Sequence, residues 1–234
     1  MTSKRWKVND RRFVCFLDIM GFKDYIARTK HEDVYKTMKN LSDLRQSSNT
    51  IVGYLFDDST IFTTSFSDSI VIFSKDNSKD SLEAISYATS FILGRAAKDR
   101  IPMKGALAEG QLAVDKSEQI FFGQPLIDAY LLQENEVDYY GVVCHNSVES
   151  FIVEYGKGPW SINPGFKEIP TPLKSGKISH MNLDWFNYIK EDSDINTPFN
   201  QIIKDFKTMT SGKPRKYIDN TEEVFRLFYP TTER

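Results

Sequence analysis

The 234-residue sequence predicts an α+β fold, an α/β sandwich in which helices pack against a mixed or mostly antiparallel sheet. Segments rich in β-branched and aromatic residues recur along the chain, and segments with apolar residues at helical spacing lie between them. A two-residue turn joins two of the strand-like segments, as in a tight hairpin. Apolar residues make up 40% of the chain, which is enough to bury one sizeable core.

The first predicted strand covers residues 13–17 and ends at Asp18. Its residues are apolar at both alternating positions, which is typical of a central strand covered on two faces. A helix is predicted from Glu32, with apolar residues on one face until the segment SSNT interrupts the pattern. An antiparallel hairpin follows, made of STIFTTSF and SIVIFS, with Ser67 and Asp68 at or near its tip.

The next segments complete a predicted core over residues 1–155. A helix capped by Asp80 precedes a long strand, IPMKGALAEGQLAVD, in which Gly105 and Gly110 permit a close backbone approach or a bulge. A short helix after Gly123 and a last strand, YYGVVCHNSV, end this core.

Residues 156–234 are expected to form an extension that packs on the core. Residues 156–177 hold four of the nine prolines, which predicts a loop or short irregular strands. Thr197 precedes a proline and is a good helix start, and Asn220 or Thr221 is expected to cap a last short helix.

Composition sets the expected class of protein. A formal net charge of −2 gives no electrostatic footprint for nucleic acid, so no nucleic-acid partner is expected. The longest apolar runs are too short for a membrane span, and the basic start is not followed by the apolar stretch of a signal peptide. Cys15 and Cys144 each lie inside a predicted strand and are expected to be buried thiols. A cytoplasmic protein without a membrane partner is the expectation.

Two acids stand at predicted strand ends, Asp18 after the first strand and Asp68 at the hairpin. If the hairpin pairs beside the first strand, both carboxylates project at one edge of the sheet, and their repulsion would raise the pKa of one of them. A pair of divalent cations, Mg²⁺ or Mn²⁺, would neutralise them. Backbone N–H groups of the turn Met20, Gly21 and Phe22 could then hold phosphates. The alternative is ordinary turn chemistry, because Asp and Ser favour such corners.

Four motifs in order carry a family resemblance: FLDIMGF, SFSDSIVIF, MKGALAEG and FFGQPLIDAYLLQ. Between about Arg12 and Val148 the chain resembles the catalytic domain of class III nucleotide cyclases. The resemblance implies a ferredoxin-like palm with helices on a mostly antiparallel sheet. It also implies two metal ions, Mn²⁺ or Mg²⁺, bound by Asp18, Asp68 and the backbone carbonyl of Ile19, with residues 19–22 against the triphosphate.

The sequence departs from this family at four positions. Adenylate cyclases carry a purine-reading Lys where this chain has Thr64, and their second base-reading residue falls on Ile120. The Asn and Arg that the family directs at the ribose and the transition state fall on Ile127 and Leu131. A purine cyclase is therefore not the expected activity, and a diguanylate-type enzyme is not expected either, because its Gly-Gly-acid-acid-Phe motif is missing.

The combination of motifs, together with RKYIDNTEEVF near residue 220, is similar to the bacterial pyrimidine cyclases of the Pycsar antiphage system. That resemblance implies conversion of UTP to 3′,5′-cyclic UMP and diphosphate, as a second messenger in antiphage defence. It also implies a homodimer with sites at the interface and a separate effector that binds the cyclic nucleotide. The alternatives are a cytidylate cyclase acting on CTP, or a non-catalytic nucleotide-binding or dimerisation module.

The remaining candidate site residues follow from this resemblance. Lys104 is the candidate for the positive charge that the missing Arg would supply, and its alternative is a solvated lysine on an edge strand. Thr64, Ile120 and Phe122 are candidates for lining the base pocket, with an ordinary core position as the alternative. Tyr54 is a candidate for stacking on the base.

Overall fold

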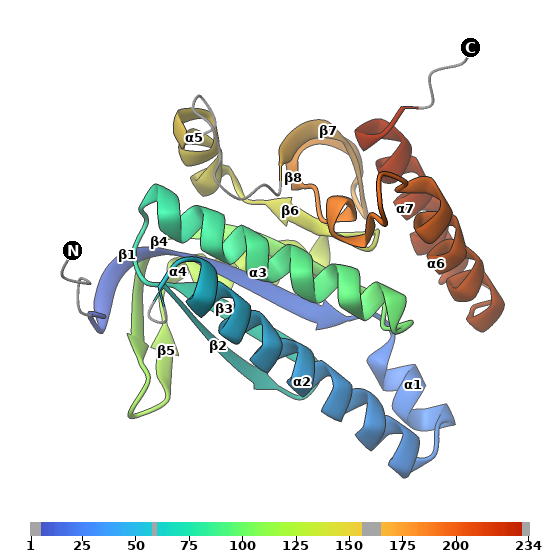
Figure 1. Cartoon of the computed structure of the whole chain (residues 1–234), viewed down its shortest axis with the longest axis horizontal. Helices are drawn as coiled ribbons and strands as arrows, with labels where there is room; N and C mark the ends of the chain where they lie inside the picture. The colour runs from blue at the N-terminus through green and yellow to red at the C-terminus, as the bar shows by residue number, and fades with distance from the viewer. Residues whose placement is uncertain (1–5, 58–59, 156–164, 231–234) are drawn as a thin grey trace.

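A computed structural model of the chain describes residues 6–57, 60–155 and 165–230. Within them, strands and helices alternate around one sheet (Figure 1). The strands are β1 (Asn9–Ile19), β2 (Ile61–Phe66), β3 (Ser69–Ser74), β4 (Met103–Asp115), β5 (Ile120–Phe122), β6 (Val142–Cys144), β7 (Phe166–Leu173) and β8 (Gly176–Leu183). Their order is β2-β3-β1-β4-β6-β8-β7, with β5 on β4. Of the described pairings only β4 with β6 is parallel. The predicted α+β fold is confirmed.

Helices cover the sheet unequally. They are α1 (Phe22–Arg28), α2 (His31–Leu55), α3 (Lys79–Lys98), α4 (Gln124–Asn135), α5 (Asn146–Tyr155), the 3-10 helix η1 (Phe186–Ile189), α6 (Asn196–Met209) and α7 (Arg215–Phe228). Figure 1 shows α2 and α3 side by side over one face, α4 behind the sheet, and α6 with α7 at the end of the molecule near α1.

The larger core lies under α2 and α3. Alternate residues of β1, including Phe13 and Leu17, point into it and meet Ile85 and Ile92 of α3, all fully buried. The other face has a smaller core of seven fully buried residues, which includes Val14 of β1 and Ala129 of α4. β1 is therefore apolar on both faces because each face of the sheet carries a core, as predicted for a central strand.

Gly105 lets β1 and β4 approach each other. A Cβ atom built at this glycine would lie 2.5 Å from both the Leu17 side chain and the Phe16 carbonyl oxygen. Only glycine fits there, which confirms the close backbone approach predicted from MKGALAEG.

Three predicted boundaries are wrong. Ser78, not Asp80, caps α3, and its hydroxyl accepts a hydrogen bond from the Ser81 N–H at 3.3 Å. The strand predicted in YYGVVCHNSV is limited to β6, because α5 already begins at Asn146. Thr221 lies inside α7 and its hydroxyl donates to the Tyr217 carbonyl oxygen, so it caps nothing.

The prediction of a loop or short irregular strands at residues 156–177 is also wrong where the structure describes this segment. Residues 156–164 lie outside the described part, but β7 and β8 form a regular antiparallel hairpin from residue 166. Pro170 and Pro172 are tolerated because β7 is an edge strand that needs fewer N–H donors. β8 joins the sheet through a pairing of Asn182 with Val143 of β6.

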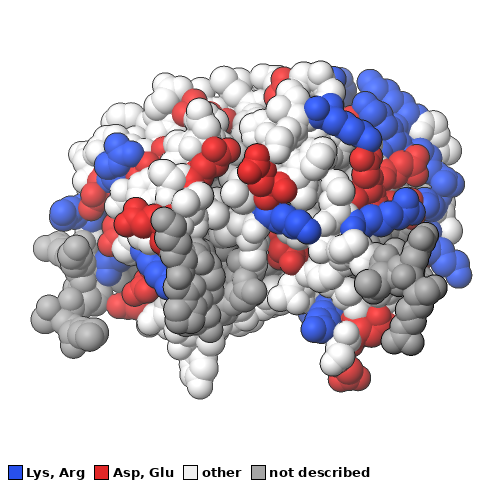
Figure 2. Space-filling model, turned by 90° about the horizontal axis from the view of Figure 1, so that it is seen from above, with Lys and Arg blue, Asp and Glu red and all other residues white. Residues whose placement is uncertain are grey.

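Charged side chains of both signs are interspersed over the face seen in Figure 2, and Lys and Arg gather at the end where α6 and α7 lie. Several are paired there, for example Lys207 with Glu222 at 2.8 Å.

None of the described helices is long and apolar enough to cross a membrane. Cys15 and Cys144 are both buried free thiols, as predicted.

Candidate active site

Asp18 lies near the end of β1, between two neighbouring strands. Its register partner on β3 is Ser69, and its register partner on β4 is Lys104. The hairpin therefore pairs directly beside the first strand. Its tip adjoins the end of β1, where the Ile19 N–H donates to the Asp68 carbonyl oxygen at 3.3 Å. The structure brings the two predicted acids to the same end of the sheet.

The Asp18 carboxylate is held by two side chains. The Ser69 hydroxyl donates to Oδ1 at 2.9 Å, and the Gln133 side-chain amide of α4 donates to Oδ2 at 3.4 Å. Burial raises the pKa of Asp18 to about 6, the Ser69 hydrogen bond opposes this, and the Asp68 charge raises it further. Asp68 is thus close enough to act on Asp18 electrostatically, as expected for two acids that share a site.

Lys104 is not the solvated edge lysine of the alternative interpretation. β4 is a central strand, and Lys104 is only 6% exposed. Its ammonium donates to the Gln133 carbonyl oxygen at 2.8 Å and lies 3.9 Å from the Glu134 carboxylate. Burial lowers the pKa of Lys104. Lys104 thus caps the C-terminal turn of α4 from beside Asp18.

The turn after β1 has the conformation that its sequence predicts. Gly21 has a φ of 75°, a left-handed conformation that favours glycine, and it directly precedes α1. The Met20 N–H donates to the Pro102 carbonyl oxygen at 2.9 Å, and Phe22 is buried in the larger core. These contacts anchor the turn next to the two acids.

The donor set at this edge fits a hard divalent cation. The side chains of Asp18 and Asp68 and the backbone of Ile19 stand at this edge, and carboxylate and carbonyl oxygens are the ligands such an ion takes. No group of three or more His, Cys, Asp or Glu that could hold a metal occurs in the described ranges. Mg²⁺ is commonly bound through one or two carboxylates plus substrate phosphates, so two acids are sufficient only when a phosphate ligand is present.

Comparison with solved structures identifies the fold. The chain is similar to a bacterial light-regulated adenylyl cyclase, with a TM-score of 0.55 and 11% identity over 86% of this chain. It spans 58% of the length of that protein. It is also similar to the guanylate cyclase domain of RhGC from Catenaria anguillulae in complex with GTP, with a TM-score of 0.51, 13% identity and coverage of 77% of this chain and 98% of that one.

A third similar structure is the catalytic core of a rhodopsin-guanylyl cyclase with converted specificity in complex with ATPαS, with a TM-score of 0.50 and 14% identity. The match covers 74% of this chain and 95% of that catalytic core. The fold is that of a nucleotide cyclase catalytic domain. No protein-family model and no curated protein matches the sequence. The fold expected from the four motifs is therefore confirmed.

The cyclase fold places Thr64 near the acids. Thr64 is half-buried on β2 and pairs with Val71, which pairs in turn with Phe16 of β1. This row lies directly behind the row that contains Ser69 and Asp18, on the same face of the sheet.

Three other candidates lie at the opposite end of the molecule. Ile120 and Phe122 belong to β5 and pair with Asp115 and Ala113 at the end of β4, about 30 Å along β4 from Lys104. Both are largely exposed, and Phe121 between them packs on Phe62 instead. Tyr54 is 90% exposed and lies one residue before the end of α2, an end that Figure 1 shows far from α1. Within one chain the cyclase fold does not bring these residues to Asp18.

Ile127 and Leu131, at the family's Asn and Arg positions, form an exposed apolar stripe on α4 with Tyr130. Leu131 is 45% exposed and Ile127 is 50% exposed. Tyr130 also packs edge-on against Phe16, with ring centroids 5.4 Å apart. The stripe therefore borders the sheet face that carries Asp18.

Sequence reasoning missed Ser69, Gln133 and Phe66. Ser69 follows Asp68 in SDS and lies two residues before Val71, so the alternation of a strand could have placed both on one face. Phe66 shares the row of Ser69 and Asp18 and is 87% exposed, which only the register reveals. Gln133 sits in a helix whose packing direction the sequence does not give.

Proposed function

We propose that this protein is a nucleotide cyclase that converts UTP to 3′,5′-cyclic UMP and diphosphate with the help of two divalent metal ions. The observation that carries the proposal is the placement of Asp18 and Asp68 at adjoining strand ends, near enough for one charge to raise the pKa of the other. Both acids stand in a nucleotide cyclase fold.

The metal ions, Mn²⁺ or Mg²⁺, would be held by Asp18, Asp68 and the Ile19 carbonyl. When bound, such ions lower the pKa of an attacking hydroxyl and neutralise a leaving phosphate. The chain's own residues set the geometry. Ser69 and Gln133 fix the orientation of the Asp18 carboxylate. Each carboxylate oxygen accepts only one of these hydrogen bonds and keeps a lone pair that can bind a metal ion.

The backbone of residues 19–22 would bind the triphosphate. Gly21 turns the chain so that N–H groups at the start of α1 remain without intrahelical acceptors, and no side chain caps them. Lys104 lies beside Asp18 in register and supplies fixed positive charge, although its ammonium donates to Gln133 rather than facing the open side. Lys104 therefore acts by keeping α4 and Gln133 in place.

The uracil preference rests on the residues that replace the purine readers. Thr64 offers one small hydroxyl beside the half-buried Val71 and Phe16, which suits a small base better than a purine. The further proposal that cyclic UMP is a messenger for a separate effector in antiphage defence rests on the family resemblance alone.

The active form is proposed to be a homodimer with two equivalent sites. Ile120 and Phe122 can join a site at Asp18 only if they come from a second chain, because they lie at the other end of their own sheet. The exposed stripe of Ile127, Tyr130 and Leu131 would be buried between the chains. A Leu131→Glu substitution is expected to shift the protein to monomer in sedimentation velocity and to abolish activity with it.

The activity is tested by incubating the purified protein with each of the four ribonucleoside triphosphates and Mn²⁺. Released diphosphate and the cyclic product are measured by mass spectrometry. The proposal predicts a cyclic product from UTP, and the Asp18→Asn variant is the negative control.

Other outcomes identify the alternatives. A product from CTP alone would make the protein a cytidylate cyclase, and a product from ATP or GTP would contradict the pyrimidine assignment. If the folded dimer forms no product from any nucleotide, the protein is a nucleotide-binding or dimerisation module. This second candidate is favoured by Ile127 and Leu131, which stand where the family has Asn and Arg.

A further inference from the structure

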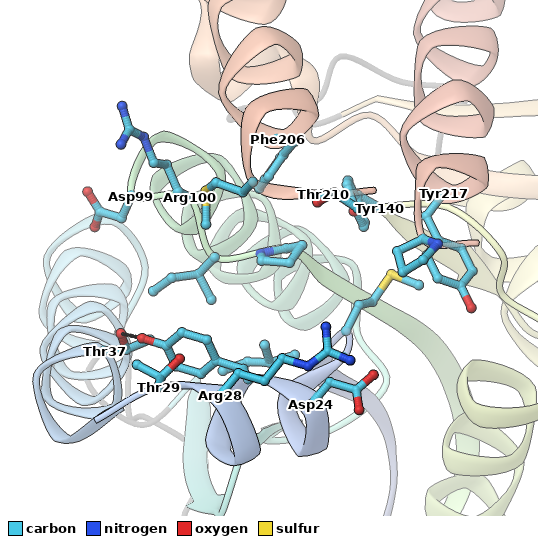
Figure 3. A pocket seen from close by; sticks show the side chains of 18 of the residues that line it. Asp24, Arg28, Thr29, Thr37, Asp99, Arg100, Tyr140, Phe206, Thr210 and Tyr217 are labelled. Atoms are coloured by element: carbon cyan, nitrogen blue, oxygen red, sulfur yellow. Dashed lines mark hydrogen bonds between the residues drawn. The ribbon is translucent and has the colours of Figure 1, made fainter. Parts of the chain in front are cut away.

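A pocket of about 530 Å³ lies between α1, the connection from α3 to β4, and the corner where α6 meets α7 (Figure 3). Ile19 and Met20 line it, but Asp18 and Asp68 do not. The pocket therefore adjoins the candidate active site from the other side of the turn. Its volume lies in the range that holds a drug-sized molecule.

The pocket walls are mainly aromatic and apolar. Tyr25 comes from α1, Tyr140 precedes β6, and Phe206 comes from α6. Phe206 packs against Tyr140 with ring centroids 4.9 Å apart, and the Tyr25 hydroxyl is hydrogen-bonded to Thr37 at 2.8 Å. These rings are held in place by the protein, so a flat molecule would meet preformed walls.

Two opposite charges lie at one side of this pocket. Asp24 and Arg28 are one turn apart on α1, both line the pocket, and Figure 3 shows both side chains extending from α1 along it. Neither has an ion pair with any residue that the structure describes. Arg100, which also lines the pocket, is by contrast paired with Asp205 at 3.2 Å.

Two phenol groups also lack partners. The hydroxyls of Tyr140 and Tyr217 make no hydrogen bond within the described part of the chain, although both residues line the pocket. Tyr140 is only 5% exposed. Burial raises the pKa of Tyr140, and the neighbouring Tyr217 adds to this. Neither hydroxyl is among the fully buried polar atoms that lack a partner, so both are open to the pocket, and a bound molecule can form hydrogen bonds with them.

We infer that this pocket binds a small, uncharged heteroaromatic molecule that carries a hydrogen-bond donor and an acceptor side by side, as an aromatic amide does. A carboxylate would be attracted by Arg28 but repelled by Asp24, and an ammonium group would meet the reverse. Asp24 and Arg28 are both exposed to solvent at the rim of the pocket, and an amide edge can donate to Asp24 and accept from Arg28 at the same time. The flat ring would lie between the aromatic walls.

A thiol placed in the pocket tests this binding chemistry. Met209 lines the pocket and is 57% exposed, whereas both native cysteines are fully buried. In a Met209→Cys variant the thiolate attacks a disulfide reagent, forms a mixed disulfide and releases the reagent's other half as a thiolate. Two reagents share one ring: the disulfide of 6-mercaptonicotinamide, which is neutral, and the disulfide of 6-mercaptonicotinic acid, which is anionic.

The control thiol is Thr208→Cys, because Thr208 is the exposed neighbour in α6 that does not line the pocket. The ratio of amide to acid rates is compared at the two positions, which cancels the intrinsic reactivity of each reagent. Binding before reaction predicts a ratio about tenfold higher for Met209→Cys, with rates that saturate as the amide concentration rises. Equal ratios at the two positions would overturn the inference.

Charge variants sharpen the result. Adding Asp24→Asn to Met209→Cys leaves Arg28 alone and is expected to shift the preference toward the acid. Adding Arg28→Gln is expected to slow the acid further, while the exposed Arg226→Gln leaves the ratio unchanged. If neither Asp24→Asn nor Arg28→Gln changes the ratio of amide to acid rates, these charges do not select the ligand, and the inference is overturned. Competitive protection by UTP with Mn²⁺ would assign the pocket to the substrate and would also overturn the inference.

Discussion

The two faces of the sheet are packed differently, although the same strands build both. Under α2 and α3, Phe13, Leu17 and Ile72 have no exposed surface. On the other face Phe16 and Val71 alternate with them along β1 and β3 but are only half-buried. One face is a closed core, and the other is a core that only α4 and β5 partly cover.

The difference indicates that the residues of the larger core and the candidate site residues lie on opposite faces of the sheet. Asp18 and its hydrogen-bond partner Ser69 both point to the partly covered face. Lys104 and the exposed Phe66 stand in the same row. The closed face carries the larger core, and the partly covered face carries the residues of the proposed substrate site and dimer interface.

The largest expected effect is on the acids of the partly covered face. Asp18→Asn or Asp68→Asn is expected to lower UTP cyclase activity by about a thousandfold or more, because metal coordination contributes several kcal/mol to the transition state. The far-UV circular dichroism spectrum should stay unchanged. The matched control is Asp43→Asn on α2, an exposed acid over the covered face, which should keep full activity. Full activity in either site variant would remove the proposed mechanism.

A smaller effect compares neighbouring residues on the two faces. Ile72→Ala should lower the free energy of unfolding by about 2–5 kcal/mol, because it leaves a cavity in the closed core. Val71→Ala should cost about 1 kcal/mol, because its side chain is only half-buried. Urea titration of the dilute protein measures both. Equal losses would mean that the second face is as closed as the first.

Lys104 offers a test of how α4 is held over the site. Lys104→Met leaves the Gln133 carbonyl oxygen without its donor and should cost about 1–3 kcal/mol. Lys174→Met is the matched control, since the exposed Lys174 also caps α4 through the Glu134 carbonyl oxygen but water can replace it there. A loss no greater than in this control would show that Lys104 does not anchor α4.

The smallest effect is the contribution of the Asp18 charge to the stability of the metal-free protein. The folded pKa of Asp18, about 6, exceeds the ordinary aspartate value of 3.8, so the ionised carboxylate destabilises the fold above pH 6. In chelator-treated samples Asp18→Asn should therefore be more stable than the original protein at pH 7. The gain should be about 1–2 kcal/mol after allowance for solvent screening of this partly exposed group.

This advantage should disappear as the pH falls from 6 to about 4, because the folded protein then takes up the proton that the unfolded chain still lacks. Urea titrations at both pH values measure it. If Asp18→Asn is no more stable than the original protein at pH 7, the ionised Asp18 carboxylate does not destabilise the fold.

The sequence predicts the closed face better than the partly covered one. The continuous apolar run in RFVCFLDI and the short SD turn of the hairpin were sufficient to place β1, β2 and β3, because a central strand with a core on each face leaves a strong local pattern. The same pattern placed Asp18 and Asp68 at one sheet end. The regular β7 and β8 hairpin was missed, since prolines on an edge strand look like a loop.

The rest of the site depends on contacts between distant segments. Gln133 reaches Asp18 across 115 positions of the chain, and no local pattern encodes that contact. Tyr54 was expected at the base, but α2 carries it away from α1 by about 1.5 Å per residue. A helix's length is visible in a sequence, whereas its direction across a sheet is set by packing.

The most direct test is the binding of Mn²⁺ in the presence of 3′-deoxy-UTP, which has the triphosphate but lacks the hydroxyl needed to cyclise. Electron paramagnetic resonance counts the bound ions. The proposed site predicts two Mn²⁺ per chain in the original protein and the loss of at least one in Asp18→Asn and in Asp68→Asn. Variants that bind the same number of ions with the same affinity would contradict a shared metal site at these two acids.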